Sequence, residues 1–189
     1  MPQAINELKK AYKSGSVKAA QVSEEIQQAA RNAASKGLTF VDVRMGLVGN
    51  QESGRVATLR KQGVEVVSYC DSGEMGHALR GWGKPVPRGT RGLLQQCRKL
   101  YLAALHAATL EAPHVFAQVI QDCKKAADRG QAIYTWHFEV HRDDWGRNHH
   151  FPVTPLVLEM LEKEPGLEVR SADRFFSPKS HATLSGWAA

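Results

Sequence analysis

Apolar residues recur at helical spacing twice in the first third of the chain, and polar residues fill the positions between them. The first set predicts a short helix over residues 3–13, and the segment KSGS at 13–16 is expected to break it. The second set predicts a helix over residues 23–37, where Gly37 suits a left-handed end. The two sets are Ile5, Leu8 and Tyr12, and then Val22, Ile26, Ala29, Ala30 and Ala33.

The stretch 39–67, TFVDVRMGLVGNQESGRVATLRKQGVEVV, carries the richest local pattern in the chain. Thr39 followed by Asp42 is similar to a capping box, which predicts a short helix over residues 40–45. The glycine-bracketed residues 46–49 suit a tight turn. A second helix is predicted over residues 50–62, and a strand from Val64. The rival interpretation makes residues 39–45 a strand instead.

The second helix of this stretch divides into two faces. Val56 and Leu59 are expected to pack inward, and its polar groups are left for a ligand. RVATLRKQGVEV resembles the R-I-x-x-L-R-x-x-G-x-x-I signature of winged helix-turn-helix domains of phage and prophage proteins. That resemblance implies a recognition helix in a major groove, although Glu52 stands where the family has an apolar residue. The other interpretation is a helix–strand unit that does not contact DNA.

Periodicity disappears over residues 70–92, which hold six glycines and two prolines. Residues 71–76 suit the wing or a turn, and residues 80–92 are interpreted as a basic linker around Trp82. Such a linker either follows a phosphate backbone or is only a solvated tether. The residues expected to bind DNA, taken from the second helix and this linker, are Gln51, Arg55, Thr58, Arg60, Lys61, Arg80, Lys84 and Arg88, with Arg91 nearby.

The second half of the chain predicts an α+β module. Two helices with apolar faces are expected at 93–111 and from Pro113 to about residue 127, with Gly130 after them. Strict alternation over 133–141 predicts a strand. Thr154-Pro155 is expected to start a helix reaching Lys163, and strands are expected at 167–172 and 182–187. The predicted fold class is therefore α+β, with a winged domain (1–79), a linker (80–92) and an α+β domain (93–189).

Charge is distributed unevenly between the two halves. The net charge is +6; residues 1–93 hold fourteen Lys and Arg against eight Asp and Glu, and residues 94–189 hold eleven of each. A localised excess of cations is what phosphate binding requires, although a value of six also fits ordinary solubility charge. No apolar run approaches a membrane span, and no signal-peptide block is present, so we expect a cytoplasmic protein.

Histidines provide the best candidate in the sequence for a reactive or metal site. His137, Glu139 and His141 alternate along the predicted strand and share one face, and His149 and His150 follow in the next loop. A hydrated sheet face explains the same pattern without an ion, so we expect no metal, no cofactor and no enzyme. Three separated cysteines, with no C-x-x-C pair, indicate buried thiols, and nothing supports Cys123 as a nucleophile.

The combined prediction is a phage or mobile-element protein that binds duplex DNA as a regulator or accessory factor. We expect it to be a homodimer, with the apolar faces of the helices at 93–128 as a candidate interface. The first alternative is a phage-encoded inhibitor that uses the same fold to bind a host protein. A metal-dependent nuclease using the histidines is the third.

Overall fold

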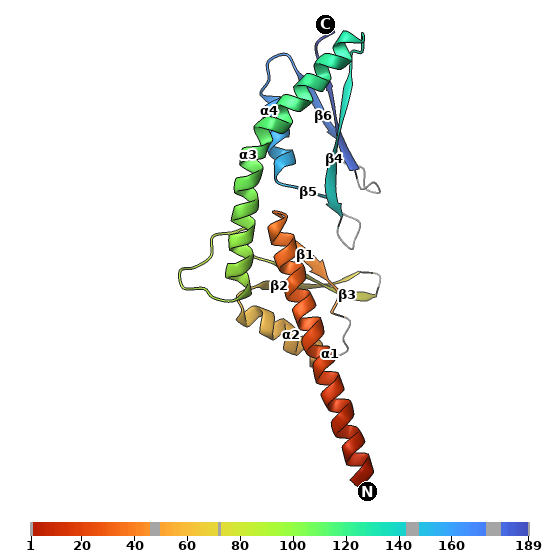
Figure 1. Ribbon diagram of the computed structural model, residues 1–189, viewed down its shortest axis with the longest axis vertical. Coiled ribbons are helices and arrows are strands. Elements are labelled where there is room, and N and C mark those ends of the chain that lie inside the picture. The colour runs from red at the N-terminus through yellow and green to blue at the C-terminus, as the bar shows by residue number, and fades with distance from the viewer. Residues whose placement is uncertain (1, 46–49, 72, 143–147, 173–178, 189) are drawn as a thin grey trace.

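The computed structural model describes residues 2–45, 50–71, 73–142, 148–172 and 179–188, which form helices and two antiparallel sheets. The α+β class predicted from the sequence is therefore confirmed. In Figure 1 one sheet lies near the middle of an elongated molecule and the other near its C-terminal end, and one long helix runs alongside both.

The first sheet shows that the predicted helix over residues 40–45 is wrong. Strand β1 (Phe40–Val43) occupies this position, and the order β1-β3-β2 places β3 (Glu74–Arg80) between β1 and β2 (Glu65–Asp71). The rival interpretation of this segment as a strand is therefore confirmed. Aromatic and β-branched residues favour an extended chain, and all four residues of β1 pair in register with β3.

Helix α2 (Asn50–Lys61) and strand β2 agree with the sequence pattern. Gly63 has a φ of 84°, as expected for a glycine that ends a helix. Val56 and Leu59 are both buried, as their spacing predicts. Strand β2 pairs with β3 along its whole length, so the segment at 71–76, expected as a wing or a turn, joins two paired strands.

Strand β3 was missed because Gly76 and the polar His77 interrupt its apolar pattern, and Gly73 and Gly81 flank it. His77 and Leu79 nevertheless point into the core, and the hydroxyl of Ser68 lies 2.9 Å from Nδ1 of His77 on the neighbouring strand. Trp82 directly follows the strand. It is fully buried, donates from Nε1 to the Leu38 carbonyl at 2.7 Å, and belongs to the first core instead of to a solvated tether.

Helix α1 (Pro2–Ser35) is a single helix of 34 residues, so the predicted break at residues 13–16 is wrong. Gly15 is accommodated within it, and Ser16 donates its hydroxyl proton to the Lys13 carbonyl at 2.8 Å. A glycine inside a helix costs only about 1 kcal/mol, which neighbouring helical turns can offset. The predicted end is correct, because Gly37 has a φ of 75°.

Helix α3 (Leu93–Asp128) is also continuous, although two helices separated at Pro113 were predicted. Pro113 lies on an exposed face of α3, next to the buried Ala112. A proline inside a helix removes one backbone hydrogen bond. On a solvent face, water can satisfy the carbonyl that loses its partner. Gly130, with a φ of 73°, follows the helix as predicted.

The second sheet has the order β5-β4-β7-β6. Strand β4 (Tyr134–Arg142) matches the predicted strand closely, and it pairs with β5 (Asn148–His150) and β7 (Lys179–Ser185). Strand β6 (Glu168–Ala172) and helix α4 (Val153–Glu162) lie near their predicted positions, whereas β5 was missed. Helices α3 and α4 pack on the apolar face of this second sheet, where Val157, Leu161 and Leu184 are fully buried.

The apolar core of the first sheet extends into α3. Leu93, Leu94 and Cys97, from its first turns, are buried together with the inner faces of α1 and the sheet. Residues from Ala112 onward belong to the core of the second sheet. One helix therefore supplies side chains to both cores.

Contacts between the two halves are tight where α1 ends. A Cβ atom added at Gly37 would lie 2.1 Å from the side chain of Pro152, and 3.5 Å from Ala104. The Phe40 ring of β1 meets the His149 ring of β5 edge-on, with 4.4 Å between centroids. These contacts join the end of α1 and the start of β1 to strand β5 and the start of α4.

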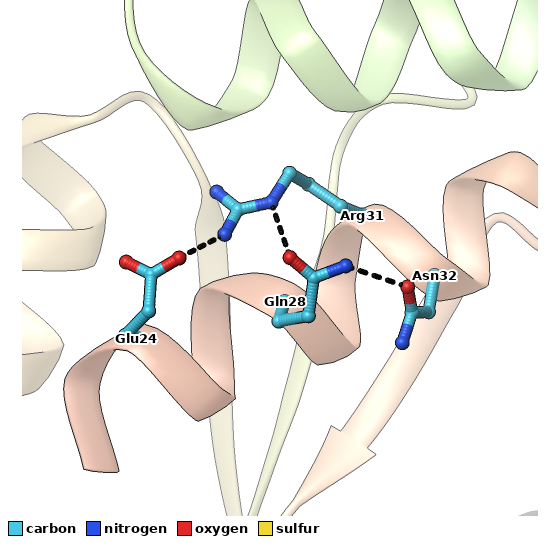
Figure 2. Close-up of polar contacts among 4 residues, drawn as sticks. All are labelled: Glu24, Gln28, Arg31 and Asn32. Atoms are coloured by element: carbon cyan, nitrogen blue, oxygen red, sulfur yellow. Dashed lines mark hydrogen bonds and ion pairs between the residues drawn. The ribbon is translucent and has the colours of Figure 1, made fainter. Parts of the chain in front are cut away.

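A series of side-chain hydrogen bonds and an ion pair stabilises the second half of α1 (Figure 2). Gln28 accepts from Nε of Arg31 at 3.1 Å and donates to Asn32 at 2.8 Å, and Arg31 also forms an ion pair with Glu24. The positive charge of Arg31 also acts on the thiol of Cys97 in α3, and this interaction by itself lowers the pKa of the thiol. The burial of Cys97 dominates, and raises the pKa of this thiol to about 11.

Candidate functional site

Exposed cations gather where α2 ends. Gly63 turns the chain there, and its Cα faces Leu94 and the Thr90 methyl group. The Leu94 amide donates to the Gln62 carbonyl at 3.3 Å, which holds the end of α2 against the segment leading into α3. Cations from two separate parts of the sequence are thereby brought to one corner of the molecule.

We call this cluster the basic corner, and define it as Arg60, Lys61, Arg88 and Arg91. All four residues are exposed. Arg60 donates from Nη2 to the Val66 carbonyl at 3.2 Å, on the open edge of β2. Within the described part of the chain, no hydrogen bond or ion pair engages Lys61, Arg88 or Arg91. Such cations have the chemistry to bind phosphate groups.

Two of the residues predicted to bind DNA from α2 lie elsewhere. Arg55 is partly buried and donates from Nη2 to the Ala19 carbonyl of α1 at 3.0 Å. Thr58 donates its hydroxyl proton to the Gly54 carbonyl at 2.9 Å. Both line a groove between α1 and α2. The side chain of Gln51 lies outside the described residues.

Arg80 and Lys84 lie at a third place, around a pocket of about 390 Å³ beside β1 and β3. Arg80 forms an ion pair with Glu65 at 2.6 Å. That hydrogen bond, together with the nearby charges of Arg80 and Lys84, lowers the pKa of the Glu65 carboxyl group. The pocket therefore combines two cations with a carboxylate, and Arg80 is already partnered. The predicted DNA-binding set is thus divided among three places.

The histidines are distributed over both faces of the second sheet. His137 and Glu139 are exposed on its outer face, which His141 shares by alternation. His149 lies opposite His141 in register, with 6.5 Å between ring centroids. His150, in contrast, lies on the inner face, where its ring is 5.4 Å from that of Phe138.

Sequence reasoning missed His181, which lies opposite His137 in register, with 5.9 Å between ring centroids. Its alternation with Ala182 and Leu184 could have placed it on the outer face, but its pairing with β4 depends on the topology. No group of three or more metal-binding side chains is assembled among the described residues.

Two of the three cysteines are buried and electrostatically unsuited to nucleophilic chemistry. Burial raises the pKa of the Cys97 thiol to about 11, and burial likewise raises the pKa of Cys123. Because the thiolate is the reactive form, both thiols are poorly reactive near neutral pH. Cys70 is the exposed one.

No protein-family model matches this chain, and neither a curated protein nor a solved structure matches it. The described helices include none with the length and apolar character to cross a bilayer.

Proposed function

We propose that this protein binds duplex DNA through the basic corner, as a regulatory or accessory factor and not as an enzyme. The observation that supports this proposal is that α2 and the loop before α3 bring exposed cations together. Lys61, Arg88 and Arg91 have no partner among the described residues, so binding a phosphate would break no internal ion pair. The uneven charge of the two halves supports the same proposal.

In this proposal α2 is not inserted into the major groove along its first turns. Arg55 is engaged by α1, and only the C-terminal end of α2 joins the basic corner. Contacts to phosphates position a protein without reading bases. We therefore propose binding with weak sequence preference. The resemblance of residues 55–66 to phage winged domains supports an origin in a phage or mobile element, with action in the host cytoplasm.

The test is fluorescence anisotropy of a short labelled duplex, titrated with the full chain at several salt concentrations. Each phosphate contact contributes about −0.9 to the slope of log K against log salt. A K61Q/R88Q/R91Q variant should weaken binding to all duplex sequences alike, and reduce the magnitude of the slope by about 3.

The matched control removes three exposed cations from the second half, as K124Q/R129Q/R170Q. Its binding curve should stay close to that of the wild type. Absence of binding at low salt, or an equal loss in the control, would refute the proposal. Intact duplex after incubation with Mg²⁺, Mn²⁺ or Zn²⁺ is also expected, whereas cleavage lost in a H137A/H141A variant would establish a nuclease.

A second candidate function is binding to a host protein, which the exposed apolar residues of α1 favour. A pull-down from host lysate, with and without nuclease treatment, separates the two functions. Capture that survives the nuclease and the K61Q/R88Q/R91Q substitution would favour the protein partner. Capture that disappears with nuclease would favour DNA.

A further inference from the structure

The groove between α1 and α2 has a polar lining that belongs to neither apolar core. Figure 1 shows α2 meeting the middle of α1. The groove has a volume of about 610 Å³, and residues of α1 between Ala11 and Ser23 form one wall. Gly54, Arg55 and Thr58 of α2 form the other wall. Its volume is in the range of small-molecule sites, and no Asp or Glu is among the described residues that line it.

Arg55 is a partly buried cation that pairs with no carboxylate in the described part of the chain. Of the N–H donors on its guanidinium group, only one on Nη2 has a partner, the Ala19 carbonyl at 3.0 Å. Nη1 is buried and forms no hydrogen bond. A buried charged donor without a partner is costly. An anion in the groove would supply both the missing acceptor and a counter-charge.

Ser23 adds a second donor at the same end of the groove. It lies one helical turn after Ala19, on the same face of α1, and it lines the groove together with Arg55. Its hydroxyl group forms no hydrogen bond with any other residue that the structure describes, so its proton is available. Donors from two helices suit an anion with several oxygens. A phosphate group matches the fork of an arginine in this way.

The middle of the groove offers acceptors instead of donors. Ser16 donates its hydroxyl proton to the Lys13 carbonyl at 2.8 Å, and Thr58 donates its own to the Gly54 carbonyl at 2.9 Å. Both hydroxyl oxygens therefore remain as acceptors for a ligand that carries hydroxyl groups, such as a sugar. A Cβ atom added at Gly15 or Gly54 would meet no atom within 4 Å, so there is space for such a ring.

An aromatic ring lines the other end of the groove. Tyr12 is 81% exposed, and its ring can stack on a planar group. Tyr12 and Ala19 are seven residues apart, which is about 10 Å along the helix axis. A nucleoside monophosphate has about this distance between its phosphate and the far side of its base. The order of donors, acceptors and aromatic ring along the groove thus follows the order of groups in such a ligand.

We propose that this groove binds a small organic phosphate of the nucleoside monophosphate class. The phosphate accepts hydrogen bonds from Arg55 and Ser23, the sugar hydroxyl groups donate to Ser16 and Thr58, and the base stacks on Tyr12. This proposal goes beyond duplex DNA binding and is independent of it, because none of these residues belongs to the basic corner.

The first experiment is isothermal titration calorimetry of the full chain with adenosine 5′-monophosphate. One molecule should bind per chain, and adenosine or inorganic phosphate alone should bind at least about ten-fold more weakly. Arg55→Gln should weaken binding of the monophosphate by about ten- to 100-fold, because it removes charged hydrogen bonds. The matched control is K61Q/R88Q/R91Q, which removes the free cations of the basic corner and should leave this binding unchanged.

The second experiment blocks the groove without changing Arg55. Gly15→Leu fills the middle of the groove and should abolish binding, with an unchanged circular dichroism spectrum because leucine favours a helix. Tyr12→Ala should lower the affinity for the monophosphate towards that for inorganic phosphate.

Several results would overturn the proposal. They are a wild type that binds no monophosphate at millimolar concentration, equal affinity for adenosine and its monophosphate, or unchanged binding in both Arg55→Gln and Gly15→Leu. If the monophosphate does not bind and Arg55→Gln weakens duplex binding as strongly as K61Q/R88Q/R91Q, Arg55 contacts DNA instead.

Discussion

Replacing Trp82 with phenylalanine tests whether the glycine-rich segment after β3 belongs to the core. The substitution removes the indole N–H that donates to the Leu38 carbonyl at 2.7 Å, and leaves that carbonyl buried without this partner. A buried unsatisfied acceptor costs about 1–3 kcal/mol. The smaller ring also leaves a void that costs about 1 kcal/mol more. The free energy of unfolding should therefore fall by about 2–4 kcal/mol.

Urea unfolding followed by far-ultraviolet circular dichroism measures this change without depending on the lost tryptophan. Arg88→Ala is the matched control, because Arg88 is exposed in the same segment and should alter stability by less than about 0.5 kcal/mol. A Trp82→Phe variant as stable as the wild type would refute the reasoning. It would return the segment to the role of a solvated tether.

Two further predictions concern the contact between the halves and the buried thiol. Gly37→Ala should destabilise the protein by more than about 2 kcal/mol, because φ at this residue is 75° and the new methyl group would collide with Pro152. Thermal unfolding measures the loss. Gly15→Ala is the control, because a methyl group at Gly15 would meet no other atom. The pKa of Cys97 is raised from 9.0 to about 11, so the unfolded chain releases this proton first as pH rises. Stability should therefore fall by about 2–3 kcal/mol between these pH values, and less in Cys97→Ala, as urea titrations can show.

Local patterns were sufficient where the deciding interactions are close in sequence. Helix α2 with Gly63, and strand β4 with its alternating faces, were both predicted from such patterns. Residues 40–43 were assigned wrongly because Thr39 and Asp42 imitate a capping box, whereas pairing with β3 decides the structure. That partner lies more than thirty residues away, and Gly76 within it and the glycines on either side obscure its strand pattern.

The candidate site was only partly predictable for a related reason. The sequence located the cations, but it did not reveal which of them already have partners. Arg55 bonds to Ala19 and Arg80 pairs with Glu65, and both contacts depend on the packing of separate elements. Arg88 was predicted to contact DNA as part of a linker, and the packing of that segment against the end of α2 became visible only in the structure. His181 was missed because its place beside His137 follows from strand order.

Helix α3 has a consequence for how this chain can change by recombination. At about 1.5 Å per residue, its 36 residues extend roughly 54 Å, and its two ends belong to different cores. A crossover at residue 92 would separate Leu93 and Cys97 from the partners with which they pack. A crossover between residues 101 and 112 would keep both sets of apolar neighbours, provided that the helical register is preserved. The two halves are therefore expected to be inherited together, or exchanged only within that interval.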